Sequence, residues 1–305
     1  MSGRSASGVL PVEKGAGVTS FQVVAHLRRL LRAPKVGHGG TLDPDATGVL
    51  PILLGEATKL TPYLVDMDKE YVATIRLGIT TETQDLSGAV VATSPVPALD
   101  EKLVADALRP FVGLIRQVPP MYSALHHEGR RLYELAREGR TVDREPREVI
   151  VHAIDVVSVA LPDVVLRVRC GKGTYIRALA ADLGKALGCG ATLAALARTR
   201  VGPYALEESV SWPDVRDARH GAALWDRILP PDSALSSLLP VRLDARQARA
   251  FGHGQPVDAP TGAAGHARVY GPGGDLLGIG TIQGHLVRPE RLLHADPRRP
   301  SVLPG

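Results

Sequence analysis

The chain has 305 residues, of which 44% are hydrophobic, so it is long enough to bury the core of one large domain and one small domain. Its formal net charge of +4 permits a polyanionic partner without demonstrating one. No segment reaches the roughly 18 apolar residues of a membrane span, and none has the charged and apolar regions of a signal peptide. The two cysteines, Cys170 and Cys189, lack metal-type spacing. We therefore expect a cytoplasmic protein with reduced thiols and no membrane partner.

Two elements are predicted near the start of the chain. Residues 8–12 are typical of a short strand. A helix is predicted at residues 21–31, where apolar side chains recur at helical spacing and where Thr19 or Ser20 can cap the first turn.

The next segment, residues 37–50, contains four glycines, one histidine and two carboxylates. Pro44 biases Asp43 towards an extended or turn conformation, so Asp43 is predicted to lie on a stiff loop. A lone aspartate in a turn is most often a turn or capping residue. The apolar run at 49–54 anchors this loop in a core, however, and a carboxylate held rigidly there is a candidate nucleophile or general base.

A strand is predicted at residues 71–77, with Tyr71 at the start of its core-facing row. Tyr71 is then either an ordinary core tyrosine or a ring that stacks on an extruded base. Residues 97–112 are predicted to form one exposed helix that ends at Phe111.

Two more strands are predicted at 149–161 and 164–170, followed by a helix that begins at Ile176. Arg177 is poorly placed for the dipole at a helix start, which indicates a specific anionic partner. Seven basic residues and one acid lie between Arg167 and Arg200, and this excess of positive charge favours a patch that faces phosphates.

The texture of the sequence changes past residue 230. Prolines at 230–231 and 240 mark a linker, and residues 241–252 can form a short helix. Short strands separated by Gly-rich turns follow at 266–270, 276–282 and 285–289. They predict a small β-rich domain, which either binds RNA or is a structural appendage.

Four blocks of sequence resemble a known family in the right order. Residues 39–50, Gly-Gly-Thr-Leu-Asp-Pro-Asp-Ala-Thr-Gly-Val-Leu, closely match the signature of the TruB family of pseudouridine synthases. Residues 172–177, Lys-Gly-Thr-Tyr-Ile-Arg, match its second strong signature, and the segments 77–88 and 117–124 match further blocks. The resemblance covers roughly residues 9–205. Gly15 stands where the family usually has proline, so the match is weaker there.

The resemblance implies an α/β fold of the α+β type, built on a mixed, mainly antiparallel sheet. It implies a catalytic domain at 9–230, with a thumb-like insertion at about 119–148. It also implies a small β-rich, PUA-like RNA-binding domain at 240–305.

The resemblance also assigns roles to individual residues. Asp43 is implied as the nucleophile, on either the base or the sugar carbon, and Arg177 as the residue that pairs with it. Tyr71 would stack on the uracil and help to remove the C5 proton. The remaining substrate-binding residues would be His38 near the RNA, Tyr175 and Leu196 in the base pocket, and Lys59. Alone, His38 fits a turn, Leu196 a core and Lys59 an exposed surface.

The implied reaction converts uridine 55 in the T loop of tRNA into pseudouridine. An isomerisation needs no group donor or redox change, so no cofactor and no metal are expected. We expect a monomer that acts on the T arm without a protein partner. Two alternatives stay open, which are a dyskerin-type synthase directed by a guide RNA and a non-catalytic tRNA-binding or folding chaperone.

Overall fold

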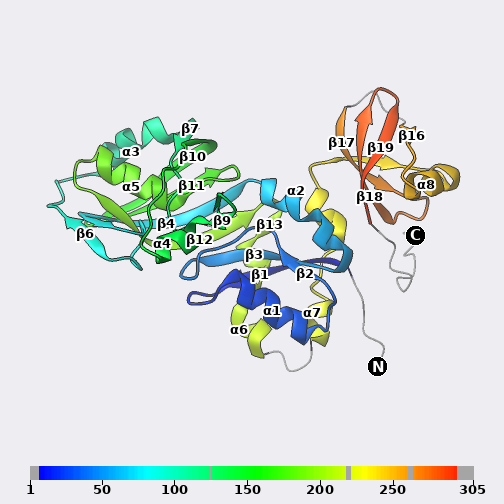
Figure 1. Cartoon of the computed structure of the whole chain (residues 1–305), viewed down its shortest axis with the longest axis horizontal. Coiled ribbons are helices and arrows are strands. Elements are labelled where there is room, and N and C mark those ends of the chain that lie inside the picture. The colour runs from blue at the N-terminus through cyan, green and yellow to red at the C-terminus, as the bar shows by residue number, and fades with distance from the viewer. Residues whose placement is uncertain (1–6, 124, 218–220, 260–263, 294–305) are drawn as a thin grey trace. The chain divides into compact units, whose positions relative to one another are not determined.

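The structure is a computed structural model that describes residues 7–123, 125–217, 221–259 and 264–293 (Figure 1). It divides into a first unit, residues 1–44, 49–65 and 202–305, and a second unit, residues 45–48 and 66–201. This division does not test the predicted domain limits 9–230 and 240–305 or the insertion at 119–148, which stay predictions. Residues 294–305 lie outside the described residues.

The second unit is built on one large sheet. Its strands follow the order β12-β4-β11-β10-β7, and all these neighbours pair antiparallel. At the other side of β12, Thr47 and Gly48 from the start of β3 pair in parallel with Ala197 and Arg198. The five strands are β4 (Lys69–Leu77), β7 (Gly113–Gln117), β10 (Arg147–Ala160), β11 (Asp163–Cys170) and β12 (Ala191–Val201).

Helices α3 (Glu101–Leu108) and α5 (Ile176–Ala186) cover one face of this sheet (Figure 1). The alternation predicted for 71–77 is confirmed, because Ala73, Ile75 and Leu77 are buried against these helices. The remaining elements of the unit are β5 (Ile79–Thr81), β6 (Val90–Thr93), η2 (Arg109–Phe111), β8 (His126–His127), β9 (Arg130–Arg131) and α4 (Leu132–Arg137).

The prediction of one exposed helix over 97–112 is wrong in its start and in its exposure. Helix α3 begins only after Asp100, whose carboxylate accepts a hydrogen bond from the Leu103 backbone N–H as an N-cap. Val104 and Leu108 are buried in the core of the unit, so this helix is one of its packed layers.

The first unit contains a second group of strands, in which β1 (Gly8–Lys14) lies between β14 and β3 (Thr47–Leu54). Helix α1 (Ser20–Leu30) begins as predicted, with Thr19 as its N-cap. The other elements are β2 (Val36–His38), η1 (Gly55–Leu60), α2 (Thr61–Asp66), β13 (Tyr204–Ala205), η3 (Leu206–Glu208), β14 (Val210–Ser211), α6 (Trp212–Asp217), α7 (Ala222–Trp225) and η4 (Pro231–Leu235).

The C-terminal part of the first unit is a five-stranded sheet of order β15-β17-β18-β19-β16 with its own apolar cluster. The helix predicted at 241–252 starts later, because the chain first forms a strand and Asp244 then caps the helix. Its elements are β15 (Leu239–Arg242), α8 (Ala245–Gly252), β16 (Val257–Asp258), β17 (Gly265–Tyr270), β18 (Leu276–Gln283) and β19 (Leu286–Leu292).

The predicted fold class is confirmed, since the chain combines a mixed, mainly antiparallel sheet with a small β-rich C-terminal part. Across the described residues, every helix is too short or too polar to cross a membrane.

Candidate functional site

The Asp43 loop is held by hydrogen bonds on both sides of the aspartate. Ahead of it, the buried Ser20 hydroxyl accepts from the Leu42 backbone N–H at 3.0 Å and donates to the Leu42 carbonyl at 3.2 Å. Behind it, the Pro44 carbonyl accepts from the buried Lys14 ammonium at 2.8 Å and from the Gly17 N–H at 3.0 Å. The half-buried Asp43 is thus carried by a clamped, irregular backbone, as the sequence predicts.

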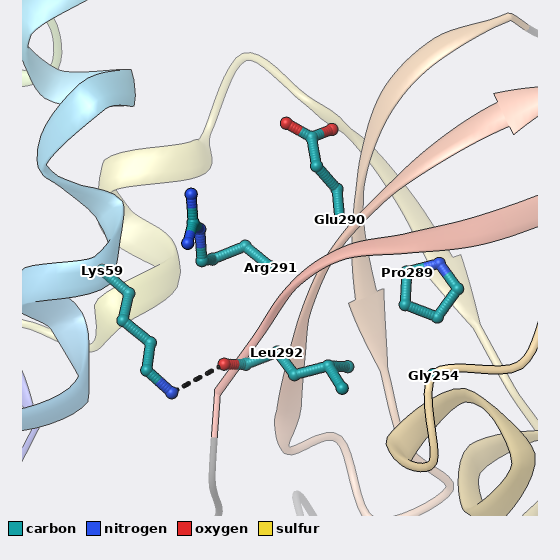
Figure 2. Close-up of a pocket in the computed structure, with 6 residues that line it drawn as sticks. All are labelled: Lys59, Gly254, Pro289, Glu290, Arg291 and Leu292. Atoms are coloured by element: carbon teal, nitrogen blue, oxygen red, sulfur yellow. Dashed lines mark hydrogen bonds between the residues drawn. The ribbon is translucent and has the colours of Figure 1, made fainter.

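Two other predicted residues lie on elements of the same unit. His38 ends strand β2, where it pairs with Ile52 of β3. Lys59 lies in η1, and its ammonium pairs with Glu56 and donates to the Leu292 carbonyl at 2.9 Å. Figure 2 shows this bond at the edge of a pocket of about 370 Å³ lined by Lys59 and residues of the C-terminal part. Protein atoms therefore bind this ammonium, and an RNA contact of Lys59 stays a prediction.

Tyr71 and Leu196 lie on neighbouring strands of the second unit. Tyr71 on β4 pairs in register with Arg198 on β12, and Leu196 pairs with Ala73 two residues along. Both Tyr71 and Leu196 are partly buried against the core of the unit. The structure thus brings the predicted stacking ring and the predicted pocket leucine onto adjacent strands.

Gly48 explains how closely the chain approaches β12 at this point. A Cβ atom on Gly48 would lie 2.2 Å from the Arg198 carbonyl oxygen, and the backbone of Gly48 has a φ of +105°. Only glycine accepts both the contact and this conformation without strain. The glycine in the signature at 39–50 therefore lets the chain after Asp45 join the strand that carries Leu196 and Arg198.

Arg177 lies in the first turn of α5, and only 5% of its surface is exposed. Its guanidinium donates to the Tyr122 carbonyl at 2.9 Å and to the Thr83 carbonyl at 3.2 Å. Its Nε lies 3.8 Å from Oδ2 of Asp85. The anionic partner that the sequence predicts for Arg177 therefore includes Asp85, which sequence reasoning did not single out.

Asp85 is itself fixed by the loop that contains it. Its Oδ1 accepts from the Thr83 hydroxyl at 2.6 Å and from the Ser87 backbone N–H at 3.0 Å. The backbone beside it pairs with Leu193 of β12, since Leu193 N–H donates to the Gln84 carbonyl. The Thr-x-Asp-x-Ser spacing in this segment is the sequence signal that could have identified a carboxylate held in place by its neighbours.

Tyr175 is the residue before α5 and is gripped through its backbone. Its N–H donates to Oε1 of Gln117 at 3.0 Å, and Nε2 of Gln117 donates back to its carbonyl at 3.3 Å. Gln117 is buried at the end of β7. The side chain of Gln117 therefore fixes the start of α5, and with it the position of Arg177.

The prediction of one basic patch over 167–200 is wrong for two of its members. Arg177 and Arg198 are buried, with 5% and 2% of their surfaces exposed. Arg167 and Arg169 are exposed on β11, and Arg169 and Arg200 lie opposite Glu70 of β4 in the strand register. The exposed arginines therefore occupy the outer face of the sheet, whereas the buried ones belong to its interior.

Within the described ranges, no three His, Cys, Asp or Glu side chains gather in a metal-binding arrangement. The pairing of Asp43 with Arg177 stays a prediction, because these two residues belong to different units.

The chain is similar to proteins of known structure. Among solved structures, the crystal structure of a Cbf5-Nop10-Gar1 complex contains a similar chain, with a TM-score of 0.73 and 28% identity over 93% of this chain and 84% of that chain. The structure of an H/ACA RNP bound to a substrate RNA containing 2'-deoxyuridine also matches, with a TM-score of 0.73 and 26% identity over 97% and 87% of the two chains.

Three family models cover the sequence. They are the TruB family pseudouridylate synthase (N terminal domain) at residues 28–176, the tRNA pseudouridylate synthase B C-terminal domain at 177–236, and Pseudouridine synthase II TruB, C-terminal, at 240–293. The tRNA pseudouridine synthase B of Dechloromonas aromatica (strain RCB) is 48% identical over 95% of this chain and 96% of that protein. That of Burkholderia mallei (strain NCTC 10247) is 47% identical over 96% and 99%. The chain therefore belongs to the TruB family of pseudouridylate synthases.

Proposed function

We propose that this protein converts uridine 55 in the T loop of tRNA into pseudouridine. The observation that carries the proposal is the clamped Asp43 loop within the family signature, together with near full-length identity to proteins named tRNA pseudouridine synthase B. Four residues beyond Asp43, Thr47 pairs with the strand that carries Leu196 and Arg198.

The proposed reaction begins when the target base leaves the stack, at a cost of a few kcal/mol. The bond between N1 and C1′ breaks, the uracil turns, and C5 bonds to C1′. C5 then loses a proton and N1 gains one, so the composition of the nucleotide is unchanged. Asp43 acts as the nucleophile on the base or on the sugar carbon.

The other residues bind or orient the reacting groups in this proposal. Arg177 pairs with Asp43 and keeps it ionised, since a nearby cation favours the charged form of a carboxylate. Tyr71 stacks on the uracil and receives the C5 proton. Tyr175 and Leu196 line the base pocket, and His38 contacts the RNA beside it.

The alternative of a guide-RNA-dependent enzyme has one observation in its favour, the similarity to the chain in the Cbf5-Nop10-Gar1 complex. The identity to that chain is 28%, compared with 48% to a tRNA pseudouridine synthase B. We therefore propose a monomer that acts in the cytoplasm on tRNA without a protein partner.

Tritium release from a tRNA transcript that carries [5-³H]uridine tests the proposal, with the purified protein alone. Release equal to one uridine per tRNA, abolished when position 55 is changed to cytidine, is the expected result. Binding of the transcript without release would instead support the chaperone alternative. Release only after a guide RNA is added would support the dyskerin-type alternative.

The C-terminal sheet is proposed to bind the acceptor side of tRNA. This sheet has its own apolar cluster. Its removal would also break contacts to the rest of the unit, among them Lys59 with Leu292, Tyr63 with Glu290 and Asp232 with Tyr270. Truncation after Ser237 should raise KM for full-length tRNA more than it lowers kcat, the pattern of lost uniform binding. Unaltered constants in a truncated protein shown by circular dichroism to be folded would exclude this role.

A further inference from the structure

Arg198 is the largest of the fully buried side chains in the described residues, and the mechanism above does not use it. Only 2% of its surface is exposed, which is rare for a charged residue because removing a charge from water is costly. A buried guanidinium persists where other groups hold it, so the groups around Arg198 indicate what it does.

One of those groups is the hydroxyl of Tyr71. Arg198 and Tyr71 are directly paired in register across β12 and β4, so their side chains leave the sheet on the same face. The guanidinium of Arg198 donates a hydrogen bond to the phenol oxygen. Burial lowers the pKa of Arg198, and the charge and hydrogen bond of Tyr71 act in the opposite direction.

A β-bulge places Arg198 in this position. The register between β12 and β4 shifts between Arg198 and Arg200, so the usual two-residue alternation is broken there. Arg200 is therefore exposed while Arg198 points to the buried side with Tyr71. Gly48 packs against the backbone of Arg198 from the neighbouring strand and leaves this strand little room to move.

We propose that Arg198 is a positioning residue that acts through Tyr71, holding its hydroxyl in place and stabilising its phenolate form. The assignment rests on the proposed function of Tyr71 as the group that receives the C5 proton. A buried cation that donates to a phenol oxygen favours the phenolate, which is the form that can accept a proton. The hydrogen bond also fixes the orientation of the Tyr71 ring, so it supports the stacking of that ring on the uracil as well.

Other ionisable groups face this pair. Lys69 lies two residues before Tyr71 on the same face of β4, and Arg198 helps to lower its pKa. Cys170 pairs with Lys69 in register on β11, and Glu70 lies on the opposite face of β4. Arg198 is hydrogen-bonded to the Tyr71 hydroxyl, so the test is built on that bond.

The first arm of the test is a double-mutant cycle between Arg198→Met and Tyr71→Phe, read as the single-turnover rate on tRNA. Arg198→Met should lower the rate by about tenfold or more, the equivalent of one charge-assisted hydrogen bond. In the Tyr71→Phe background it should lower the rate by less than about twofold, because the hydroxyl is already absent. Arg198→Lys, which keeps a donor and the charge, should recover part of the rate.

The control for this arm is Arg76→Met, the same substitution at an arginine of the same sheet that pairs with Asp163 at 2.8 Å. It should leave the rate unchanged. An equal loss from Arg198→Met in both backgrounds would show that the arginine only supports the fold, and would overturn the proposal.

The second arm needs no turnover. The absorbance change of Tyr71 on ionisation is obtained as the difference between the wild type and Tyr71→Phe, with the Arg198→Met pair measured in the same way. Tyr71 should ionise at higher pH in Arg198→Met, and an unchanged titration would overturn the proposal. Where circular dichroism shows Arg198→Met unfolded, Arg198→Gln, which also removes the charge but keeps a polar side chain, serves in both arms. A shifted titration in a protein that makes no pseudouridine would refute the proposed reaction and leave this contact established.

Discussion

Nε of Arg177 lies 3.8 Å from Oδ2 of Asp85, while the other oxygen of that carboxylate is held by Thr83 and Ser87. The arginine is buried and also bonded to two backbone carbonyls, of Tyr122 and Thr83. The position of its guanidinium is therefore fixed by the carboxylate of Asp85 and by the backbone carbonyls of Thr83 and Tyr122. A fixed cation is what the proposed pairing with Asp43 requires.

Asp85→Asn keeps the shape of this side chain and removes its charge. We expect the single-turnover rate to fall by about tenfold or more, because the orientation of the Arg177 guanidinium depends on that charge. The affinity for tRNA should stay within about twofold, since the change acts on the reacting groups and not on binding. Quench-flow kinetics and filter binding measure the two quantities.

Asp163→Asn is the matched control for this prediction, because it removes the charge from the half-buried Asp163–Arg76 pair of the same sheet. An equal loss of rate in both variants would show that the Arg177–Asp85 contact has no special role.

Ser20→Ala removes the hydroxyl that binds both backbone groups of Leu42. The buried N–H of Leu42 then loses a partner, at a cost of about 1–3 kcal/mol in the free energy of unfolding. The rate should also fall, since the Asp43 loop loses its clamp. Thr19→Ala, which removes only the helix cap, should cost about 1 kcal/mol and leave the rate unchanged. Urea unfolding and single-turnover rates compare the two, and a rate that is equal in both variants would contradict the clamp.

Lys69 gives a prediction for stability against pH. Burial, with the charge of Arg198, lowers its pKa from 10.5 to about 8. Between these values the unfolded chain holds the proton and the folded protein does not, so this lysine makes stability rise with pH in that window. The cost of burying the charge is present in full below pH 8 and absent above 10.5.

Lys69→Met should remove that rise. The free energy of unfolding of the wild type, minus that of the variant, should increase by about 2.5 kcal/mol between neutral pH and pH 10. Urea unfolding at several pH values measures this difference. Burial raises the pKa of Cys170 to about 11, so Cys170 makes stability fall as the pH rises. Both proteins contain Cys170, so its contribution largely cancels in the difference. A difference that is constant with pH would show that Lys69 is not perturbed.

The exposed arginines of β11 should contribute to the salt dependence of tRNA binding. Arg167→Gln with Arg169→Gln should flatten the slope of log affinity against log salt by about 1.5, since each phosphate contact releases about one counterion. Arg109→Gln with Arg216→Gln removes two exposed arginines elsewhere and is the control. Equal slopes for the two double variants would place the phosphate contacts on another surface.

The sequence identified the residues that lie in motifs, and missed those placed by long-range pairing. The alternation in 71–77 was enough to predict the buried row on β4, because a regular strand has a period of two. Alternation alone would place Arg198 and Arg200 on one face, but the bulge in β12 separates them, so the burial of Arg198 does not follow from the local pattern.

Asp85 and Gln117 were missed for a related reason. Each contacts the start of α5 from far away in the sequence. Asp85 lies 92 positions before Arg177, and Gln117 lies 58 positions before Tyr175. Local pattern says nothing about a contact across that length of chain. The helix at 101–108 was predicted too long, because its start depends on a cap at Asp100 that the apolar spacing alone does not mark.

The role of Asp43 is tested most directly by the single-turnover release of tritium from [5-³H]uridine tRNA by Asp43→Asn, compared with the wild type. The variant should bind tRNA with unchanged affinity and release no tritium, because the nucleophile is absent while the clamped loop is intact. Circular dichroism and filter binding establish that the variant is folded and loaded. Substantial release by the folded, tRNA-bound Asp43→Asn protein would contradict the assignment of Asp43 as the nucleophile.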